Sequence, residues 1–571
     1  MKTVFKILIS LLVFLLIVLF ALYWYMQPDK PPKSQVFING QVLTMDDNNS
    51  IAEAIAIQDD RILAVGSTSD IQTHINDNTV IHDLQGKTLI PGIIDAHGHF
   101  PGSGISVISA DLTSPPVGNI HNVAQLQERL LQRVKDKKQG EWITGFGYDD
   151  TLLAEHRHPT RQELDAVSTD HPIYITHVSG HMGVANSLAL EMADYDRNTP
   201  DPEGGVIVKD EHGELTGLLE ETAGQKLSFL TMDISPSEFY NILTTAGDEY
   251  ASKGVTTTQS GAVDGTMLKG LYGASQLGLI PLRLELWPLY NKLGEKILSG
   301  ELDLDDYNSD RVRTRTVKII ADGSIQGFTG YLSHPYHTPF RGDEEYRGYP
   351  TLPREKLADW ATRFNKAGIQ MAIHGNGDAS IDDIIYAFGE AQKNHPLSDP
   401  RLILIHSQMA REDQLDEMKQ LGITPSFFTA HTYYWGDRHR DIFMGPERAM
   451  RMSPTHSALE RDLRFSVHLD TPVVPMDPMQ MLWSTVNRLS STGKVIGEEQ
   501  RILPMQALRA TTIDAAWQIF REKDLGSLEK GKLADLVVLD RSPLVDPLSI
   551  RDIEVMQTYV GGVKIFDRNV K

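Results

Sequence analysis

The chain of 571 residues contains no cysteine. This absence excludes disulfide bonds, thiolate nucleophiles and metal sites built from thiolates. Any metal or catalytic chemistry therefore rests on histidine and carboxylate side chains. Basic residues are also in deficit, because 54 Lys and Arg stand against 76 Asp and Glu for a formal net charge of −22. Nucleic-acid binding needs a basic surface that neutralises phosphates, so we expect no nucleic-acid partner.

Long apolar runs are scarce, and the exception lies at residues 7–26, where only Ser10 interrupts the run. As a helix rising about 1.5 Å per residue, this run is about 30 Å long, which matches the hydrocarbon core of a bilayer. The aromatic residues 23–25 suit the membrane interface. The run is longer than a cleaved signal peptide requires, and no small-residue cleavage site follows it. We expect residues 1–34 to form a single-pass signal anchor and linker, with the body on the periplasmic or extracytoplasmic side.

Short β-type runs occur at both ends of the remaining chain, around residues 36–66 and 80–90 and again around residues 533–566. Turn dipeptides separate some of them. These dipeptides are Asn39-Gly40, Asp59-Asp60 and Gly561-Gly562. The pattern predicts a composite β-sandwich domain assembled from residues 35–88 and 521–571, with a larger domain inserted between the two parts.

The larger domain, residues 89–520, alternates short apolar runs with helical patterns, which is typical of βα units around a parallel sheet. Eight runs suit buried strands: 89–95, 254–260, 280–286, 314–321, 369–374, 401–406, 423–428 and 463–470. This number predicts an α/β fold of the (β/α)₈ TIM-barrel type, with the active site at the C-terminal ends of the strands. Residues 100–250 break the alternation, and we expect them to form an insertion that covers the mouth as a lid.

Metal-ligand residue types follow several of these runs where the strands end. His97 and His99 are two residues apart, so along a strand they face the same side. For a single histidine, a packing or loop role would be the ordinary interpretation. A barrel interior normally takes bulky aliphatic side chains, so the recurrence of such residues at strand ends predicts a metal centre. The candidate ligands are His97, His99, Lys318, His374, His406 and Asp470.

Imidazole and carboxylate ligands without thiolates favour zinc or another divalent transition metal, with one or two ions per chain. Such an ion would generate hydroxide from water near neutral pH, and Asp470 is the best general base to serve that attack. An ammonium repels cations, so Lys318 among metal ions must be neutral or carry a carbamate that bridges two ions. The alternative for Lys318 is an ion pair with a nearby acid such as Asp322.

Further residues are candidates for substrate contact. His181 lies in the insertion, with a loop-packing role as the alternative, and His431 follows the seventh strand, with a surface loop as the alternative. Glu220 and Glu221 are expected to begin a helix, where acids favour the dipole, with substrate binding as the other interpretation. Arg448 and His456 are candidates near the mouth, and a surface position is the alternative for both.

Several motifs together resemble the amidohydrolase superfamily, and more narrowly its YtcJ-like, amidohydrolase-3 branch. They are PGIIDAHGHF, GHMGVANSLAL, VKIIADGSIQG, IHGNGDAS and GSLEKGKLADLVVLD. The resemblance covers about residues 35–570 and implies a metal-dependent barrel hydrolase with a composite β-domain. It implies that His97, His99, His374 and His406 are ligands, that Lys318 is a carbamylated bridge, and that Asp470 is both ligand and base.

One departure from the branch lies at the end of the eighth strand. The branch usually has Gly-Ser-Asp there, whereas this chain has His468-Leu469-Asp470. The proton-transfer residue is retained. His468 shares a strand face with Asp470, so we expect it to orient or crowd that carboxylate and to affect substrate preference.

The sequence thus predicts an enzyme, a membrane-tethered metal-dependent hydrolase acting on carbon–nitrogen bonds other than peptide bonds in a small-molecule substrate. N-substituted formamides and other amides are the substrates that the resemblance implies. The same site would also serve a lactone, ester or phosphoester hydrolase. A non-catalytic binding protein is a further alternative, of which loss of metal ligands would be the sign, and no candidate ligand is lost.

Overall fold

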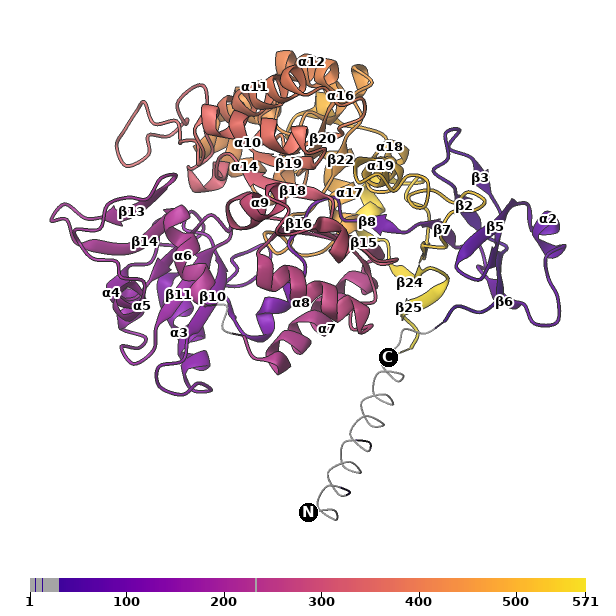
Figure 1. Ribbon diagram of the computed structural model, residues 1–571, viewed down its shortest axis with the longest axis horizontal. Helices are drawn as coiled ribbons and strands as arrows, with labels where there is room; N and C mark the ends of the chain where they lie inside the picture. The colour runs from indigo at the N-terminus through magenta and orange to yellow at the C-terminus, as the bar shows by residue number, and fades with distance from the viewer. Residues whose placement is uncertain (1–5, 7–12, 14–29, 232–233, 571) are drawn as a thin grey trace.

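The computed structural model describes residues 6, 13, 30–231 and 234–570. The predicted anchor at residues 7–26 lies outside the described residues, except for Val13. Within the described part of the chain, no helix combines the length and apolar character needed to cross a membrane. Figure 1 shows the body as a central domain that carries one smaller domain on each side.

Parallel strands form the centre of the body, and they agree in position with the eight predicted runs. Within residues 30–231 and 234–570, these strands are β8 (Ile93–Ile94), β15 (Val255–Val263), β16 (Arg283–Pro288), β18 (Thr316–Ile320), β19 (Gln370–Gly375), β20 (Leu402–His406), β21 (Ile423–Phe427) and β22 (Ser466–Val467). They lie in two sheets, ordered β17-β16-β15-β8 and β18-β19-β20-β21-β22, with β17 (Val312–Arg313) at an edge. All pairings within both sheets are parallel.

The two sheets meet on both sides, so their strands surround a common core. We call this closed set of strands the barrel. On one side a parallel bridge joins Leu289, directly after β16, to Lys318 of β18. On the other side, Asp470 N–H donates to the His97 carbonyl at 3.1 Å, and His99 N–H donates to the Thr471 carbonyl at 2.9 Å. The α/β class is therefore confirmed, and the candidate ligands after β8 and β22 become neighbours.

Helices cover the outside of these strands (Figure 1). They include α7 (Pro236–Ser252), α8 (Gly265–Gln276), α9 (Tyr290–Leu298), α10 (Arg354–Lys366), α11 (Asp378–Asn394), α12 (Glu412–Leu421), α16 (Thr455–Glu460), α17 (Pro478–Asn487), α18 (Pro504–Ala510) and α19 (Ile513–Gln518). The start of α7 illustrates the local logic, since Ser235 and Glu238 form a capping box and Pro236 occupies the first turn. Its buried face includes Leu243 and Tyr250, which join the main core.

The first predicted strand, 89–95, is wrong as a single element. Its first half is β7 (Thr88–Pro91), which pairs antiparallel with β23 (Leu536–Leu539), and its second half is β8, which pairs with β15. Gly92 separates the halves, and a Cβ there would lie 2.1 Å from Thr256 Oγ1. One apolar run therefore serves two sheets, because the chain crosses between them at a position that tolerates only glycine.

Strands from both ends of the chain form a second pair of sheets. One sheet has the order β5-β4-β1-β6 and the other β25-β24-β23-β7-β2-β3. The remaining strands are β1 (Ser34–Ile38), β2 (Gln41–Leu43), β3 (Ile51–Ala52), β4 (Ala54–Gln58), β5 (Arg61–Gly66), β6 (Val80–Asp83), β24 (Val555–Val560) and β25 (Val563–Asp567), and α2 (Thr68–Gln72) follows β5. Phe37 and Ile57 of one sheet share a core with Leu89 and Leu536 of the other.

The predicted turns have mixed outcomes. Asp59-Asp60 joins the antiparallel pair β4 and β5, and Gly561-Gly562 joins β24 and β25, so both hairpins are confirmed. The hairpin at Asn39-Gly40 is wrong, because β1 and β2 belong to different sheets. The dipeptide allows the chain to turn, and the pairing of the flanking strands determines which sheet each of them joins.

The insertion after β8 is a compact unit with its own sheet, ordered β13-β14-β12-β11-β10-β9. Its elements are η1 (Gly102–Val107), β9 (Ala110–Asp111), α3 (Val123–Val134), β10 (Ile143–Tyr148), α4 (Arg161–Asp165), β11 (Ile173–His177), β12 (Met182–Ala185), α5 (Ser187–Met192), β13 (Gly205–Lys209), β14 (Leu215–Glu221) and α6 (Thr222–Leu230). Figure 1 shows it beside the central strands, opposite the composite domain. The loops at the ends of its strands reach the site described next.

Candidate functional site

The carboxyl ends of β8 and β22 bring together a histidine pair and a carboxylate. His99 Nε2 lies 3.2 Å from Asp470 Oδ1, and His97 Nε2 lies 3.5 Å from the same oxygen. One ligand atom from each of these three residues lies within 4.8 Å of the other two. His97 is fully buried, whereas the His99 side chain is 38% exposed. The arrangement offers nitrogen and oxygen donors to a cation at the barrel mouth, and it leaves one side of the group open.

Lys318 of β18 extends this group, since its Nζ lies 3.0 Å from His97 Nε2. Burial lowers the pKa of Lys318 to about 7, although the charge of Asp470 opposes the shift. The alternative that Lys318 pairs with Asp322 is wrong. The Asp322 carboxylate instead accepts backbone N–H bonds from Tyr331, Asn376 and Gly377, which follow neighbouring strands.

His374 and His406, which end β19 and β20, lie on the far side of Asp470. Their ring centroids are 4.5 Å apart, and His406 Nε2 lies 3.9 Å from Asp470 Oδ2. His374 Nδ1 lies 3.2 Å from Asp322 Oδ1. We call His97, His99, Lys318, His374, His406 and Asp470 the mouth cluster. The structure thus brings the predicted ligand candidates to one end of the barrel.

Local packing and backbone geometry hold the cluster. A Cβ at position 261 of β15 would lie 2.4 Å from His97 Cε1, so Gly261 makes room for the ring. Trp287 at the end of β16 stacks on the other side, with centroids 5.6 Å apart and planes at 17°. Asp470 and His406 adopt left-handed backbone conformations, with φ of 59° and 70°. Non-glycine residues rarely adopt this conformation, and it is concentrated at functional sites.

The electrostatics suit metal ligation. Burial lowers the pKa values of His97, His374 and His406 well below 6.5, so these imidazoles are neutral and have a lone pair to offer. Burial alone would raise the pKa of Asp470, but the hydrogen bond from His99 holds it well below its usual range. An anionic carboxylate therefore faces neutral nitrogen donors, which is a donor set that fits a divalent transition metal.

The insertion contributes His181 to the mouth. The His181 ring centroid lies 4.9 Å from that of His374, and His181 Nδ1 donates to Glu221 Oε2 at 2.8 Å. Glu221 ends β14 with φ of 49°, directly before α6. The expectation that Glu220 and Glu221 begin a helix is wrong in detail, because both complete a strand. Glu220 instead accepts from Arg341 at 2.6 Å and from the Tyr349 hydroxyl at 3.3 Å, so its carboxylate holds the insertion to a barrel loop.

Three other candidates are not members of the mouth cluster. His431 begins α13 (His431–Tyr434) and is buried in an aromatic group, with its ring centroid 4.0 Å from that of Phe428, so the surface-loop alternative is wrong for it. Arg448 is half-buried and donates to the carbonyls of Met444, His334 and Pro335. His456 is exposed, 3.8 Å from Glu460, as the alternative interpretation of the sequence predicts.

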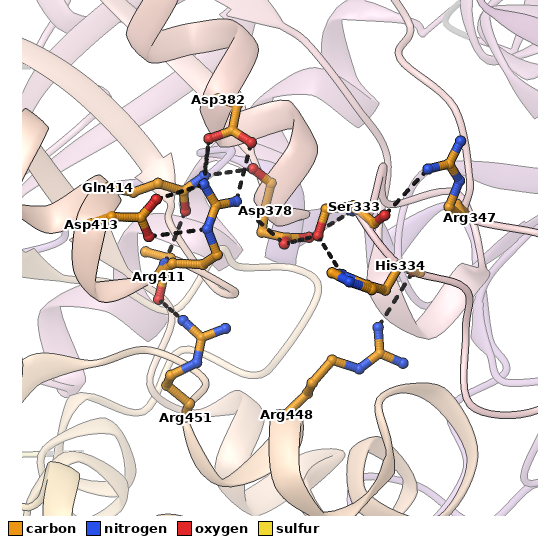
Figure 2. A network of polar contacts seen from close by, with 11 residues as sticks. Ser333, His334, Arg347, Asp378, Asp382, Arg411, Asp413, Gln414, Arg448 and Arg451 are labelled. Atoms are coloured by element: carbon orange, nitrogen blue, oxygen red, sulfur yellow. Dashed lines mark hydrogen bonds and ion pairs between the residues drawn. The ribbon is translucent and has the colours of Figure 1, made fainter.

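Figure 2 shows Arg448 beside a network of polar contacts, in which it donates to the His334 carbonyl. There Arg411 pairs with Asp382 and Asp413, and Asp378 accepts from Ser333. These residues follow β18, β19 and β20, so the network ties successive loops together. None of the residues labelled in Figure 2 belongs to the mouth cluster.

A second group of histidine and carboxylate side chains, which sequence reasoning missed, lies at the edge of the insertion. It consists of Asp149, Asp150 and His177, and we call it the insertion cluster. Asp149 accepts from Arg438 and, at 3.2 Å, from Trp435 Nε1. Both donors come from the chain after β21. The dipeptide Asp149-Asp150 directly after a strand was the available signal, but nothing local identifies its distant partners.

A cavity of about 460 Å³ lies between the insertion and the barrel. Its lining includes Asp149, Trp435 and Arg438 from the region around the insertion cluster, together with Thr471, the residue directly after Asp470. No member of the mouth cluster belongs to its described lining. The cavity therefore lies next to the mouth cluster, because Thr471 follows Asp470 in the same loop, but no residue of the cluster lines it.

Comparisons with known proteins agree with this geometry. The protein-family model described as "Amidohydrolase family" matches residues 80–566 of this chain. N-substituted formamide deformylase of Arthrobacter pascens is 29% identical over 93% of this chain and 98% of its own length. YtcJ of Bacillus subtilis, which is named as an amidohydrolase, is 26% identical over 94% of this chain and 99% of its own. The crystal structure of an uncharacterized metal-dependent hydrolase from Pyrococcus furiosus superposes with a TM-score of 0.69 at 25% identity, covering 90% of this chain and 100% of the other.

Proposed function

The chain belongs to the amidohydrolase family and is a metal-dependent hydrolase of carbon–nitrogen bonds other than peptide bonds, and we propose that its substrates are N-substituted formamides and related small amides. The observation that carries this proposal is the mouth cluster, in which neutral imidazoles converge on the anionic Asp470. The full-length similarity to a formamide deformylase supports the choice of amide over other bonds.

We propose that the metal is zinc, held by His97 and His99 on one side and by His374 and His406 on the other, with Asp470 between them. When bound, the ion acts as a Lewis acid that acidifies water and polarises the substrate carbonyl. Nitrogen and oxygen donors without thiolates are compatible with zinc. The donor atoms lie on opposite sides of Asp470, so the cluster has room for two ions.

Lys318 is the proposed bridge between the two ligand sets. Its pKa of about 7 leaves an appreciable fraction of the amine neutral at neutral pH. A neutral amine adds its lone pair to CO₂ and releases one proton, which gives a carbamate with two anionic oxygens. This modification replaces a cation among the ligands by an anion and removes the repulsion between Lys318 and a metal ion.

Asp470 is the proposed proton carrier. Its carboxylate is anionic in the resting site, so it can take a proton from the attacking water. The leaving amine needs a proton when the carbon–nitrogen bond breaks, and Asp470 then returns it. The hydrogen bond to His99 and the left-handed backbone fix the direction of the carboxylate throughout.

His181 is the proposed substrate-binding residue. Its Nδ1–H donates to Glu221. Burial would lower the pKa of His181, but Glu221 raises it above its usual value, so the protonated ring would donate from Nε2–H to the substrate carbonyl oxygen. Because His181 belongs to the insertion, the insertion and the barrel together would enclose the substrate.

The test uses the full-length protein loaded with zinc and a panel of N-alkyl and N-aryl formamides, with formate release as the readout. Carboxylic esters, lactones and phosphoesters are assayed in parallel. We expect formamides to give the highest kcat/KM and the Asp470→Asn variant to lose about 10²- to 10⁴-fold in kcat. Preferred hydrolysis of an ester or phosphoester, or a wild-type kcat in D470N, would overturn the proposal.

We also propose that residues 7–26 anchor the body to a membrane and that the body is extracytoplasmic. The length of the apolar run and its aromatic end support this proposal. The test is protease treatment of intact spheroplasts followed by detection of a C-terminal tag. Degradation without lysis is the expected result, and protection until lysis would contradict the proposed orientation.

A further inference from the structure

His468 lies two residues before Asp470, and its ring is fully buried. His468 Nε2 lies 3.1 Å from His406 Nδ1. His468 Nδ1 lies 2.9 Å from the Ser426 hydroxyl. Ser466 Oγ lies 2.8 Å from the same hydroxyl. A connected row of side chains therefore runs from Ser466 through Ser426 and His468 to His406.

The two nitrogens of His406 face different surroundings. Nε2 points toward Asp470, 3.9 Å from Oδ2, and Nδ1 points toward His468. A neutral imidazole carries its proton on one nitrogen only. If Nδ1 carries the proton, Nε2 has a free lone pair for a metal ion. If Nε2 carries it, an N–H faces the mouth cluster and ligation is blocked.

From these contacts we propose that His468 is a positioning residue that holds His406 in the tautomer protonated on Nδ1 and so presents Nε2 for metal binding. In this arrangement, His406 Nδ1–H donates to His468 Nε2, and His468 Nδ1–H donates to the Ser426 oxygen. Ser466 donates its single hydroxyl proton to Gln518 Oε1 at 2.7 Å, so Ser426 donates to Ser466 and accepts from His468. His468 thus donates once and accepts once, and His406 Nε2 keeps its lone pair.

The ring orientation is fixed by the same contacts. Ser426 and Ser466 belong to adjacent strands, β21 and β22, and pair in register. His468 follows β22 directly, so the strand register holds the His468 ring between Ser426 and His406. Outer hydrogen bonds of this kind fix the tautomer and raise the basicity of a ligating histidine, and their loss typically weakens metal binding 10- to 100-fold. By contrast, His97 Nδ1 has no hydrogen-bond partner among the described residues.

This inference rests on the proposed metal site, but it does not depend on the substrate. The experiment compares zinc affinity, measured by competition with a chromogenic chelator, in full-length wild type, His468→Leu and His468→Gln. We expect H468L to bind zinc about 10- to 100-fold more weakly. Glutamine keeps an acceptor near the position of Nε2, so H468Q should recover most of the lost affinity. The matched control is His171→Leu, which removes a buried histidine bonded to the Glu141 carbonyl far from the barrel, and its affinity should equal that of wild type.

A second readout does not depend on the variants folding. In wild-type protein with ¹⁵N-labelled histidine, the nitrogen chemical shifts of His406 should report a proton on Nδ1 with and without zinc. A proton on Nε2 in the metal-free protein would overturn the proposal, and so would zinc affinity in H468L equal to that of wild type. If wild type binds zinc but hydrolyses no amide, the proposed substrate class fails while the role of His468 stands.

Discussion

Two groups of histidine and carboxylate side chains lie near the contact between insertion and barrel, and they differ in the cation that balances their carboxylates. In the insertion cluster, Asp149 is met by the guanidinium of Arg438 and by donors from Trp435 and Thr151. Burial alone would raise the pKa of Asp149, but Arg438 holds it below its usual value. This carboxylate is already neutralised, so an added cation would meet a positive charge.

The mouth cluster has no such permanent cation. The hydrogen bond from His99 keeps Asp470 anionic, the buried histidines beside it are neutral, and burial lowers the pKa of Lys318, its cationic neighbour, to about 7. Arginine stays charged at all physiological pH values, whereas a buried lysine can become neutral. Similar residue types therefore form a structural clamp in one place and a candidate metal centre in the other, and the neighbouring cation decides which.

The largest predicted effect comes from removing ligands of the mouth cluster. The double variant His97→Ala/His99→Ala should lose most of its bound metal and all detectable hydrolysis, because two neutral nitrogen donors disappear. The matched control, Asp149→Asn/His177→Ala, changes the insertion cluster and should keep the metal content of wild type. Metal per chain is measured by elemental analysis. Equal loss in both double variants would show that the two clusters do not differ as described.

The next effect separates binding from chemistry within the mouth cluster. Asp470→Asn keeps the size of the side chain and one oxygen but cannot carry the proton. We expect kcat to fall by about 10²- to 10⁴-fold, the usual contribution of a general acid–base group. Metal content should stay largely unchanged. A variant with normal kcat would contradict the assignment of Asp470 as the proton carrier.

A third variant tests the ion pair between Arg438 and Asp149, which we call the clamp. Arg438→Met leaves the buried Asp149 without its cation, which costs about 3 kcal/mol or more when a buried pair is broken. We expect this loss in the unfolding of the insertion, measured by hydrogen exchange of β10 and β11. Arg448→Met is the control, because Arg448 bonds only to carbonyls in the described structure and leaves no carboxylate unpaired. Equal effects in both variants would argue against a special role for Arg438.

The smallest predicted effect is a pH dependence of the clamp. The folded pKa of Asp149 is below its usual value of 3.8, so its stabilising effect is present above pH 3.8 and is lost as pH falls through the folded pKa. Asp149→Asn should therefore be less stable than wild type by about 2 kcal/mol at pH 6, the scale of a hydrogen bond to a charged group. The difference should shrink at pH 3. A difference that is the same at both pH values would contradict this account.

The sequence predicted the parts of the molecule that depend on local pattern. Apolar runs located the barrel strands, and the polar residues directly after them located His374, His406 and Asp470, because all parallel strands of a barrel present their carboxyl ends to one face. It did not predict the division at Gly92, since an apolar run does not reveal which of two sheets each half joins. The same limit explains Asn39-Gly40, which turns the chain between sheets.

Contacts between distant segments of the chain could not be predicted from the sequence either. Asp149 and Arg438 are 289 positions apart, and no periodicity connects them. The position of His468 was visible, and its strand face suggested an effect on Asp470. Its ring instead bonds to His406 and Ser426, because the register between β20, β21 and β22 determines which side chains meet. Register across a barrel is a property of the closed fold and has no local signal.

Elemental analysis of the full-length protein tests the central claim most directly. The protein is purified without added metal, incubated with zinc, passed through a desalting column and compared with its H97A/H99A variant. The account predicts at least one equivalent of divalent transition metal per wild-type chain and its loss in the variant. A wild-type chain that holds no metal after incubation, or a variant that holds as much as wild type, would contradict it.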